Sequence, residues 1–484
     1  MPIMQELVEL SSKGIQDTEI VKLLIQNDSM GVDKAIMHRA NRYYNNENDV
    51  AMLDFRKYKA GGVDKTNENR SNNRISHNYL KILVEQLTDY ALGKGVGYSH
   101  EDEKFMEYLD KKLMFDFDET MSYYLEESRI TGKSYIHFYY DELGVLNYAV
   151  IQGTEIIPIY KDKYKHELVE VIRYYTVRGV DKDGKPVDRY AAEWWNDKEV
   201  KYFKQDIEDA YVLISQPITP HWFFMIDSEP DNVEGHSWGK VPFIELRTNH
   251  RGTSDLNDIK KFIDAYDLIV SEFVNQIADV REILIKVLGY SNTDASEILK
   301  AFRSTGIVKI DAKDGDIDVL KTEIPVEART AALKVLQDNI YKMGKGVDTN
   351  PEKYGTAIAG IAIQMMYKPL DLKADTAILN MKKAIMQFMW FIVDDYNRTN
   401  NAAIDCSEIE ISFNKNTIED MGSIVDSAVK LKGVVSDKTI WEQIPGIDPK
   451  QEEERMQEQD QKSLDAFNAQ VMQDNQGTPP ATGE

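Results

Sequence analysis

The chain has 484 residues, of which 42% are hydrophobic and 29% are charged, as in a folded soluble protein with a large core. Its formal net charge of −24 excludes an ordinary DNA-binding domain, because proteins that hold nucleic acid by its phosphates carry a basic surface. A single cysteine, Cys406, excludes a disulfide framework and fits a reducing compartment.

Neither a signal peptide nor a membrane span is expected. The stretch 1–20 has polar side chains where a signal peptide needs an apolar core. The longest apolar run, 385–393, is shorter than the roughly 20 residues that a bilayer requires. It is predicted to be the buried face of a helix.

The first half of the chain is predicted to be helical and then to form strands. Apolar-periodic pieces within 1–60 indicate helices, and further helices are predicted at 77–93 and 101–130. Between them, 58–74 is rich in Asn and Gly and is predicted to be a polar loop. From 134 to about 246 the hydrophobic period changes to two, which predicts antiparallel strands joined by tight turns.

The stretch 254–288 contains no proline or glycine and predicts one helix roughly 50 Å long. Its apolar residues recur at alternating steps of three and four, which mark a seam for lengthwise packing against another long helix. A long helix that crosses its own domain fits the pattern equally well. The seam consists of Leu256, Ile259, Ile263, Tyr266, Val270, Phe273, Ile277, Val280, Leu284 and Val287.

The rest of the chain alternates compact pieces with helices. A small αβ module is predicted at 289–325, and a second helix at 326–347 runs back from it. A loop at 348–356 precedes a third long helix, 357–396, which Pro369 should kink. A strand is predicted at 408–414 and shorter helices at 420–470, before a polar tail, 471–484, that is expected to be disordered.

The sequence TGKS at 131–134 resembles the end of a phosphate-binding loop. That loop needs a glycine where this chain has Glu127, and it needs a strand before it and a helix after it. Here the order is reversed, so a helix-to-strand turn is predicted. No histidine pairs with Cys406 or another histidine at metal-ligand spacing, and no nucleophile with a base is apparent. We therefore expect no cofactor, no metal and no catalytic residue.

Four stretches resemble the portal, or head-to-tail connector, proteins of long-tailed double-stranded DNA bacteriophages, in the class common among phages of Gram-positive bacteria. They are NRYYNNENDV at 41–50, the helix-to-glycine segment 77–99, the helix-turn-hairpin 130–160, and 238–280. The last is the most specific, since a proline-led strand, a polar loop and DLNDIKKFIDAYDLIVS follow one another in the family's order. The resemblance extends to about residue 400.

The resemblance implies an α+β, mainly helical fold that assembles as a ring, usually of about twelve subunits, around a DNA channel. Two long helices would form the stem, and the small αβ module between them would form the clip. The loop between the second stem helix and the kinked helix would be the tunnel loop. The implied boundaries are a wing at 1–253, stem helices at 254–288 and 326–347, a clip at 289–325, a tunnel loop at 348–356, a kinked wing helix and strand at 357–419, a crown at 420–470 and a tail at 471–484.

The implied function is a structural one, without enzymatic activity. The ring would occupy one capsid vertex of the virion, pass double-stranded DNA during packaging and ejection, and help to start procapsid assembly in the host cytoplasm. Its partners would be further copies of itself, the terminase large subunit, a head-completion or tail adaptor protein, and the major capsid and scaffolding proteins, with no membrane. The alternatives are a nucleotide-dependent packaging or DNA-processing enzyme built on TGKS, and a heptad-based scaffold.

Two groups of residues are candidates for contacts in such a ring. An acidic conduit would let DNA slide, and a few basic residues would centre it. Ion pairs between subunits, or simple solvation of the side chains, explain these lysines equally well. The channel candidates are Lys334, Lys342, Lys345, Asp348, Asn350, Lys353 and Tyr354. The candidate docking surface of the clip consists of Lys300, Arg303, Lys309, Asp311, Lys313 and Asp314.

Overall fold

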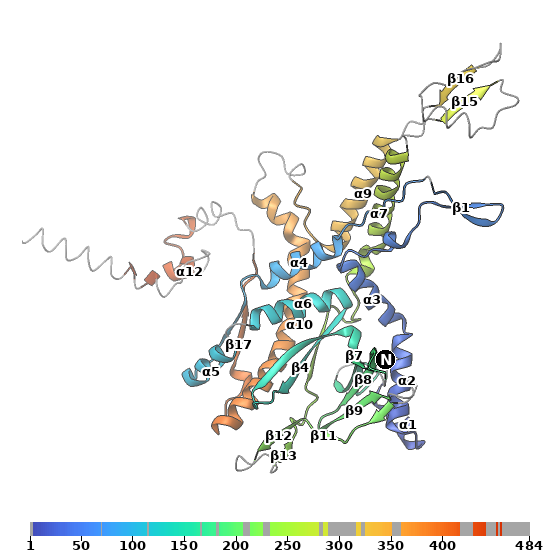
Figure 1. Cartoon of the computed structure of the whole chain (residues 1–484). Coiled ribbons are helices and arrows are strands. Elements are labelled where there is room, and N and C mark those ends of the chain that lie inside the picture. The colour runs from blue at the N-terminus through green and yellow to red at the C-terminus, as the bar shows by residue number, and fades with distance from the viewer. Residues whose placement is uncertain are drawn as a thin grey trace, which may run out of the picture. The chain divides into compact units, whose positions relative to one another are not determined.

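The computed structural model combines helices with antiparallel sheets, and it divides into two compact units (Figure 1). One unit comprises Met1–Thr349 and Pro369–Asn416, and the other Asn350–Lys368 and Thr417–Glu484. The structure describes residues 3–68, 70–113, 116–164, 167–180, 183–206, 213–225, 233–279, 284–288, 316–320, 325–350, 360–416, 429–441, 452–453 and 455–456. The predicted α+β class is confirmed.

The chain begins with three helices, α1 (Met4–Ser12), α2 (Asp17–Ser29) and α3 (Val32–Tyr44), and a short 3₁₀ turn, η1 (Asp49–Met52). The predicted polar loop that follows is partly wrong, because it contains a hairpin of β1 (Lys57–Ala60) and β2 (Val63–Thr66). Gly61 and Gly62 both have positive φ angles, of 62° and 80°, as a tight two-residue hairpin turn requires.

Helix α4 (Tyr79–Leu92) follows as predicted, and β3 (Val96–Ser99) comes after it. The prediction of one helix over 101–130 is wrong, because two helices, α5 (Glu103–Leu113) and α6 (Phe117–Thr131), cover this stretch. The predicted antiparallel region is also confirmed. A three-stranded sheet has the order β14-β4-β5, and a larger one has the order β10-β9-β8-β7-β6 with β11 on β9. The strands and one short turn are β4 (Lys133–Tyr140), β5 (Leu146–Gln152), η2 (Gly153–Glu155), β6 (Ile156–Tyr160), β7 (Leu168–Val180), β8 (Pro186–Trp195), β9 (Glu199–Gln205), β10 (Leu213–Ser215), β11 (Thr219–Pro220), β12 (Trp222–Met225), β13 (Val233–His236) and β14 (Phe243–Arg247).

The large sheet is covered on one face by the N-terminal helices. Ile20, Val21 and Leu24 of α2 pack with Ile157 and Ile172 of the sheet, and all five are buried. On its other face, Val171 and Trp195 are buried with Phe243 of β14, so both faces of this part of the sheet meet the core.

The predicted helix 254–288 is too long. Helix α7 covers Leu256–Asp279, and β15 (Leu284–Leu288) is a strand that pairs with β16 (Asp316–Leu320). The register pairs Ile285 with Val319 and Val287 with Ile317. Leu284 and Val287 therefore leave the helical seam, and Val280 lies outside the described residues.

Two more helices end near their predicted limits. Helix α9 (Val326–Gly344) is three residues shorter than predicted, because Lys345 takes a left-handed conformation with φ of 57° and ends it. Helix α10 (Gly360–Asn400) contains Pro369, and the boundary between the two units falls at this proline. A further 3₁₀ turn, η4 (Cys406–Glu408), strand β17 (Glu410–Phe413), which pairs with β3, and α12 (Asp437–Trp441) follow.

Among the described residues, no helix is both long and apolar enough to cross a bilayer.

Candidate functional site

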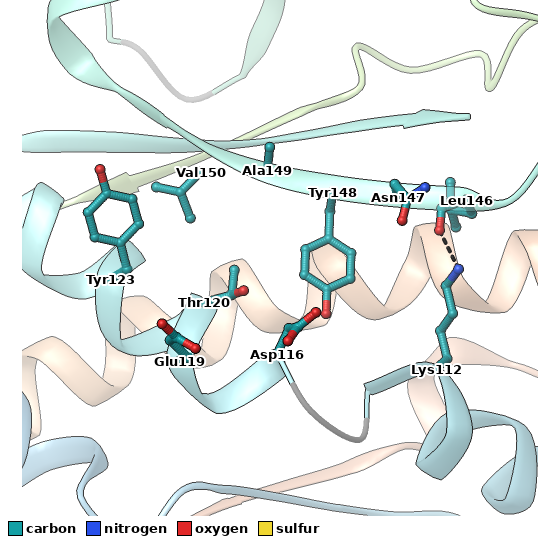
Figure 2. A pocket seen from close by; sticks show the side chains of 10 residues that line it. All are labelled: Lys112, Asp116, Glu119, Thr120, Tyr123, Leu146, Asn147, Tyr148, Ala149 and Val150. Carbon is teal, nitrogen blue, oxygen red and sulfur yellow. Dashed lines mark hydrogen bonds between the residues drawn. The ribbon is translucent and has the colours of Figure 1, made fainter. Parts of the chain in front are cut away.

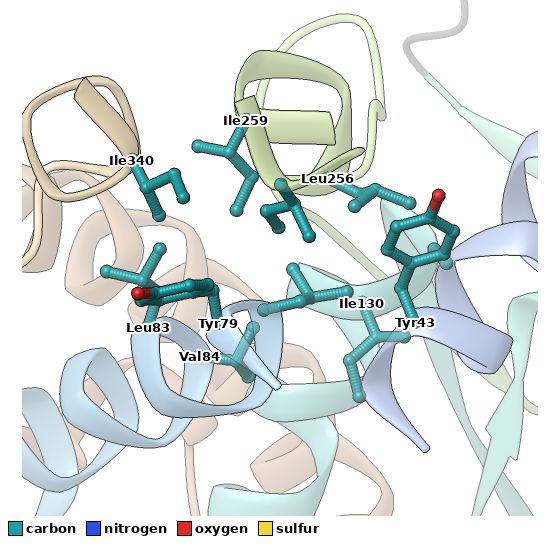
Figure 3. Close-up of a cluster of buried hydrophobic side chains, with 11 residues drawn as sticks. Tyr43, Tyr79, Leu83, Val84, Ile130, Leu256, Ile259 and Ile340 are labelled. Carbon is teal, nitrogen blue, oxygen red and sulfur yellow. The ribbon is translucent and has the colours of Figure 1, made fainter. Parts of the chain in front are cut away.

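The long helices α7 and α9 pack along each other and rise from a common apolar base (Figures 1 and 3). Helices α3, α4 and α6 contribute the rest of this base. Its buried residues are Ala40, Tyr43, Tyr79, Leu80, Leu83, Val84, Ile130, Leu256, Ile259, Ile263 and Ile340. The first three residues of the predicted seam, Leu256, Ile259 and Ile263, are thus buried in their own chain. They cannot also pack against another subunit.

The later seam residues are less covered. Tyr266, Val270 and Phe273 are half-buried, and Ile277 is 53% exposed. On α9, Val335 is 59% exposed. The far half of the helix pair therefore keeps apolar side chains in solvent within the single chain.

On its buried side, the far half of α7 is polar rather than apolar. Asp267, Ser271 and Asn275 are almost fully buried and follow one another at steps of four, with Asp279 one step further. Such steps place the four side chains in one row on the helix. We call these four residues the polar row.

The polar row binds the extended segment 70–77, which runs alongside α7. The backbone amides of alternate residues donate to successive members of the row. The pairs are Ser71 to Asp279 (2.8 Å), Asn73 to Asn275 (2.6 Å), Ile75 to Ser271 (2.9 Å) and His77 to Asp267 (3.1 Å). One step of four helical residues spans about 6.0 Å and two extended residues about 6.6 Å, so the two repeats match.

Several further bonds complete this contact. Asn275 Nδ2 donates to the Asn73 carbonyl, and Ser271 Oγ to the Ile75 carbonyl. Asp267 also accepts from Asn48 Nδ2 at 2.6 Å. A buried carboxylate with several donors is satisfied, so segment 70–77 is fixed to α7 without a β-sheet. The search for an apolar seam missed this row, although four small polar residues at steps of four were visible in the sequence.

Buried charges join the base of the helix pair to α10. Lys373 Nζ lies 2.8 Å from Asp255 Oδ2 and donates to the Gly344 carbonyl at the end of α9, also at 2.8 Å. Arg129 of α6 binds the other oxygen of Asp255 at 2.8 Å. Burial raises the pKa of Asp255, but Lys373 and Arg129 outweigh burial and hold this pKa below its ordinary value.

The backbone just before the predicted tunnel loop is also fixed. Gln86 of α4 donates to the Val347 carbonyl at 2.9 Å and accepts from the Val347 amide at 2.8 Å. Gly346 lies so close to Leu83 that an added Cβ would be 2.1 Å from that side chain. The loop residues 351–359 themselves lie outside the described residues.

The TGKS stretch is confirmed as a helix-to-strand turn. Helix α6 ends at Thr131, Gly132 has a φ of 93°, and β4 begins at Lys133. Lys133 is buried beside Glu245, with 3.7 Å between Nζ and Oε1. This lysine is occupied by a structural ion pair, which disfavours a phosphate-binding role.

A hollow of about 390 Å³ lies between α6 and β5 (Figure 2). Asp116, Glu119 and Tyr123 face it from the helix side, and Lys112 closes one end by donating to the Leu146 carbonyl. Its lining contains neither histidine nor cysteine. Within the described ranges, no three His, Cys, Asp or Glu side chains are grouped as a metal would require.

The predicted channel residues are only partly described. Lys334, Lys342 and Lys345 are exposed, and Gln337 donates to Asp348 at 3.2 Å. At about 100° per residue, Lys334 and Lys342 lie on the side of α9 away from the buried Ile340. Asn350 is half-buried. Lys353, Tyr354 and all six clip residues, Lys300, Arg303, Lys309, Asp311, Lys313 and Asp314, lie outside the described residues.

Comparison with known proteins gives consistent matches along nearly the whole chain. Residues 32–465 match the family described as phage portal protein, SPP1 Gp6-like. A portal protein of Bacillus phage SPP1 is 28% identical over 466 residues, which cover 94% of this chain and 89% of the relative. A portal protein of Clostridium phage phiCD119 is 28% identical over 470 residues, with coverage of 91% and 95%.

Proposed function

Since the chain belongs to the SPP1 Gp6-like family of phage portal proteins, we propose that α7 and α9 are the stem helices of its ring. The function is that of a phage portal, a structural part of the virion capsid that serves DNA packaging and connects head to tail. The family assembles as a ring with capsid and DNA. We assign the wing to 1–253, the clip to 289–325, the tunnel loop to 348–356 and the crown to 420–470.

One observation carries the stem assignment. The base of the α7–α9 pair is closed by the chain's own core, whereas Ile277 and Val335 in its far half are more than half exposed. Side-by-side packing of subunits in a ring would cover these apolar side chains, as the hydrophobic effect favours. The seam would then work between subunits only from about Tyr266 to Ile277.

The negative net charge of the chain is consistent with a channel through which DNA moves. With a net charge of −24 per chain, a ring of about twelve copies would repel DNA phosphates, so the duplex would slide without adhering. Lys334, Lys342 and Lys345, on or next to α9, would centre the duplex, together with Lys353 of the tunnel loop. Within the described part of the chain, no carboxylate forms an ion pair with Lys334, Lys342 or Lys345. Exposed lysines without an ion pair would be available to DNA phosphates, which supports their role in the channel.

The remaining partners follow from this architecture. The clip would dock the terminase large subunit during packaging and a head-completion or tail adaptor protein afterwards. The wing and crown would face the capsid and scaffolding proteins during assembly in the host cytoplasm. An ATP-hydrolysing enzyme built on TGKS is disfavoured, since Lys133 is buried against Glu245.

The function is tested by complementation of a related phage that lacks its own portal gene. The wild-type chain is expressed from a plasmid together with the capsid and terminase genes of the phage that encodes it. Heads filled with DNA should then be restored. Empty heads in every case would contradict the proposal.

The channel lysines are tested in the same assay. Replacing Lys334, Lys342, Lys345 and Lys353 by glutamate should reduce the DNA per head several-fold while rings still form, because the added charge repels the duplex. Four glutamates at the exposed wing residues Lys13, Lys104, Lys161 and Lys198 serve as the charge-matched control. Unchanged packaging in the channel variant would remove these lysines from the mechanism.

A further inference from the structure

The hairpin β1–β2 has a side that no described residue of its own chain covers. Of its eight strand residues, all but Ala60 are exposed. Tyr58 is 48% and Val63 61% exposed. A two-stranded hairpin is at best marginally stable in water on its own. Packing of its exposed residues against a partner would therefore stabilise it.

The two faces of the hairpin differ in chemistry. Tyr58 lies opposite Lys65, and Ala60 opposite Val63, and these two pairs share one face because side chains alternate along a strand. The other face carries Lys57 opposite Thr66 and Lys59 opposite Asp64. One face is therefore largely apolar and the other polar, as in a strand pair that packs against a protein surface on one side.

The base of the hairpin is closed by its own contacts, and the segment that follows it is fixed to α7. The Asn67 amide donates to the Arg56 carbonyl at 2.9 Å, and Arg56 binds both Asp54 and Glu68. Directly after it, segment 70–77 is bound by the polar row of α7. The hairpin is thus a braced arm that projects from α7 (Figure 1), rather than a loose loop.

The charge of the arm is opposite to that of the chain. Its strands carry three lysines, Lys57, Lys59 and Lys65, against one carboxylate, Asp64, in a chain of net charge −24. A second copy of this chain therefore offers a complementary surface. In a ring, each subunit presents two different sides, so an arm on one side meets the same patch on every neighbour.

On these grounds we infer that the β1–β2 arm of each subunit clasps the neighbouring subunit of the ring, with Tyr58, Ala60 and Val63 against it. The inference rests on the proposed ring. The lysines steer the arm toward the acidic neighbour, and burial of the apolar face supplies the affinity. A duplex in the channel would attract the lysines but would leave the apolar face uncovered, which favours protein over DNA as the partner.

The test places a photo-crosslinking phenylalanine analogue at Tyr58 and, as the matched control, at Thr66 on the opposite face. Assembled rings, identified by native mass spectrometry, are irradiated with and without duplex DNA. Subunit-to-subunit crosslinks from position 58, at least several-fold above those from position 66, are expected in both samples. Intact rings without this difference, or crosslinks from position 58 to DNA, would overturn the inference about the arm. They would not contradict the proposed ring. Absence of any ring would instead overturn the proposed function.

A second variant measures the contribution of the arm. Replacing Tyr58 and Val63 by serine leaves the core untouched, since both side chains are exposed. Half-assembly of the ring should then need about tenfold more protein, as expected when two apolar side chains lose their burial. Replacing Val180 and Tyr190 by serine is the control, since these two side chains are similarly exposed on the large sheet. An unchanged assembly midpoint in the first variant would contradict the clasp.

Discussion

At the residue scale, a few buried polar groups hold the base of the α7–α9 pair in place. Lys373 is almost fully buried, yet its one ammonium joins the start of α7, the end of α9 and α10. Burial lowers the pKa of Lys373, whereas Asp255 acts in the opposite direction. The ammonium is therefore a costly group, which its two partners stabilise.

Replacing Lys373 by methionine tests this role. The variant leaves the Gly344 carbonyl without its donor and Asp255 with Arg129 alone, so the free energy of unfolding should fall by roughly 3 kcal/mol. Urea denaturation of the unassembled chain measures it. Lys13→Met, which removes an exposed ion pair with Glu9, should change nothing measurable. Equal stability of both variants would show that Lys373 is dispensable.

A second residue-scale prediction concerns acid. Burial, with the nearby charges of Arg173 and His221, lowers the pKa of His137 from 6.5 to about 3. Below pH 6.5, His137 therefore binds a proton in the unfolded chain but not in the folded chain. The free energy of unfolding falls as the pH drops below 6.5. Each pH unit costs about 1.4 kcal/mol until the folded pKa is approached.

Replacing His137 by phenylalanine should flatten this dependence between pH 6 and about 4, since the ring still packs on Trp195 and Phe243. Urea denaturation at several pH values gives the slope, and the exposed His250→Asn is the control. His221, whose pKa burial lowers to about 4, should retain part of the effect. An unaltered slope in the His137 variant would assign the acid sensitivity elsewhere.

At the element scale, the contacts of α7 within its chain depend on two different parts of the helix. Its base is held by apolar packing and its far half by the polar row that binds segment 70–77. The polar row also binds the segment that follows the β1–β2 arm, so in the proposed ring the far half of α7 would serve the neighbouring subunit in two ways. Its exposed apolar residues would pack against that subunit directly, and its buried polar residues would position the arm.

Replacing Asn275 by leucine tests the polar row. The substitution leaves the amide and carbonyl of Asn73 unpaired, which should cost about 2 kcal/mol and expose segment 70–77. Hydrogen–deuterium exchange of 70–77 should rise while that of α4 stays the same. Lys261→Ala, on the exposed side of α7, is the control. Unchanged exchange in 70–77 would contradict the row as its anchor.

The elements that the sequence predicts well are those with a strong period over many residues. The antiparallel region, α7 up to Asp279 and the helix that contains Pro369 are of this kind. The prediction fails at 284–288 because LIKVL continues a heptad as well as it forms a strand. Its pairing with 316–320, which is remote in sequence, decides the outcome. The arm was missed because Gly61 and Gly62 indicate a loop until their flanking strands are seen to pair.

In the candidate site, too, the sequence predicts local patterns but not which remote segment they pack against. Exposure of Lys334 and Lys342 was predictable from the helical pattern of α9, since polar residues face away from the core. The fate of Leu256, Ile259 and Ile263 was not, because an apolar seam looks the same whether its partner is α4 of the same chain or a neighbouring subunit. Only the fold separates these two uses of one pattern.

At the scale of the whole molecule, the proposed assembly is a ring with an acidic channel, α7–α9 stems and arms between neighbours. Native mass spectrometry of the purified full-length chain, with negative-stain images of the same sample, tests this most directly. A closed assembly of about twelve subunits with a central hole is predicted. An open filament, or a monomer that hydrolyses ATP under every assembly condition, would contradict the account.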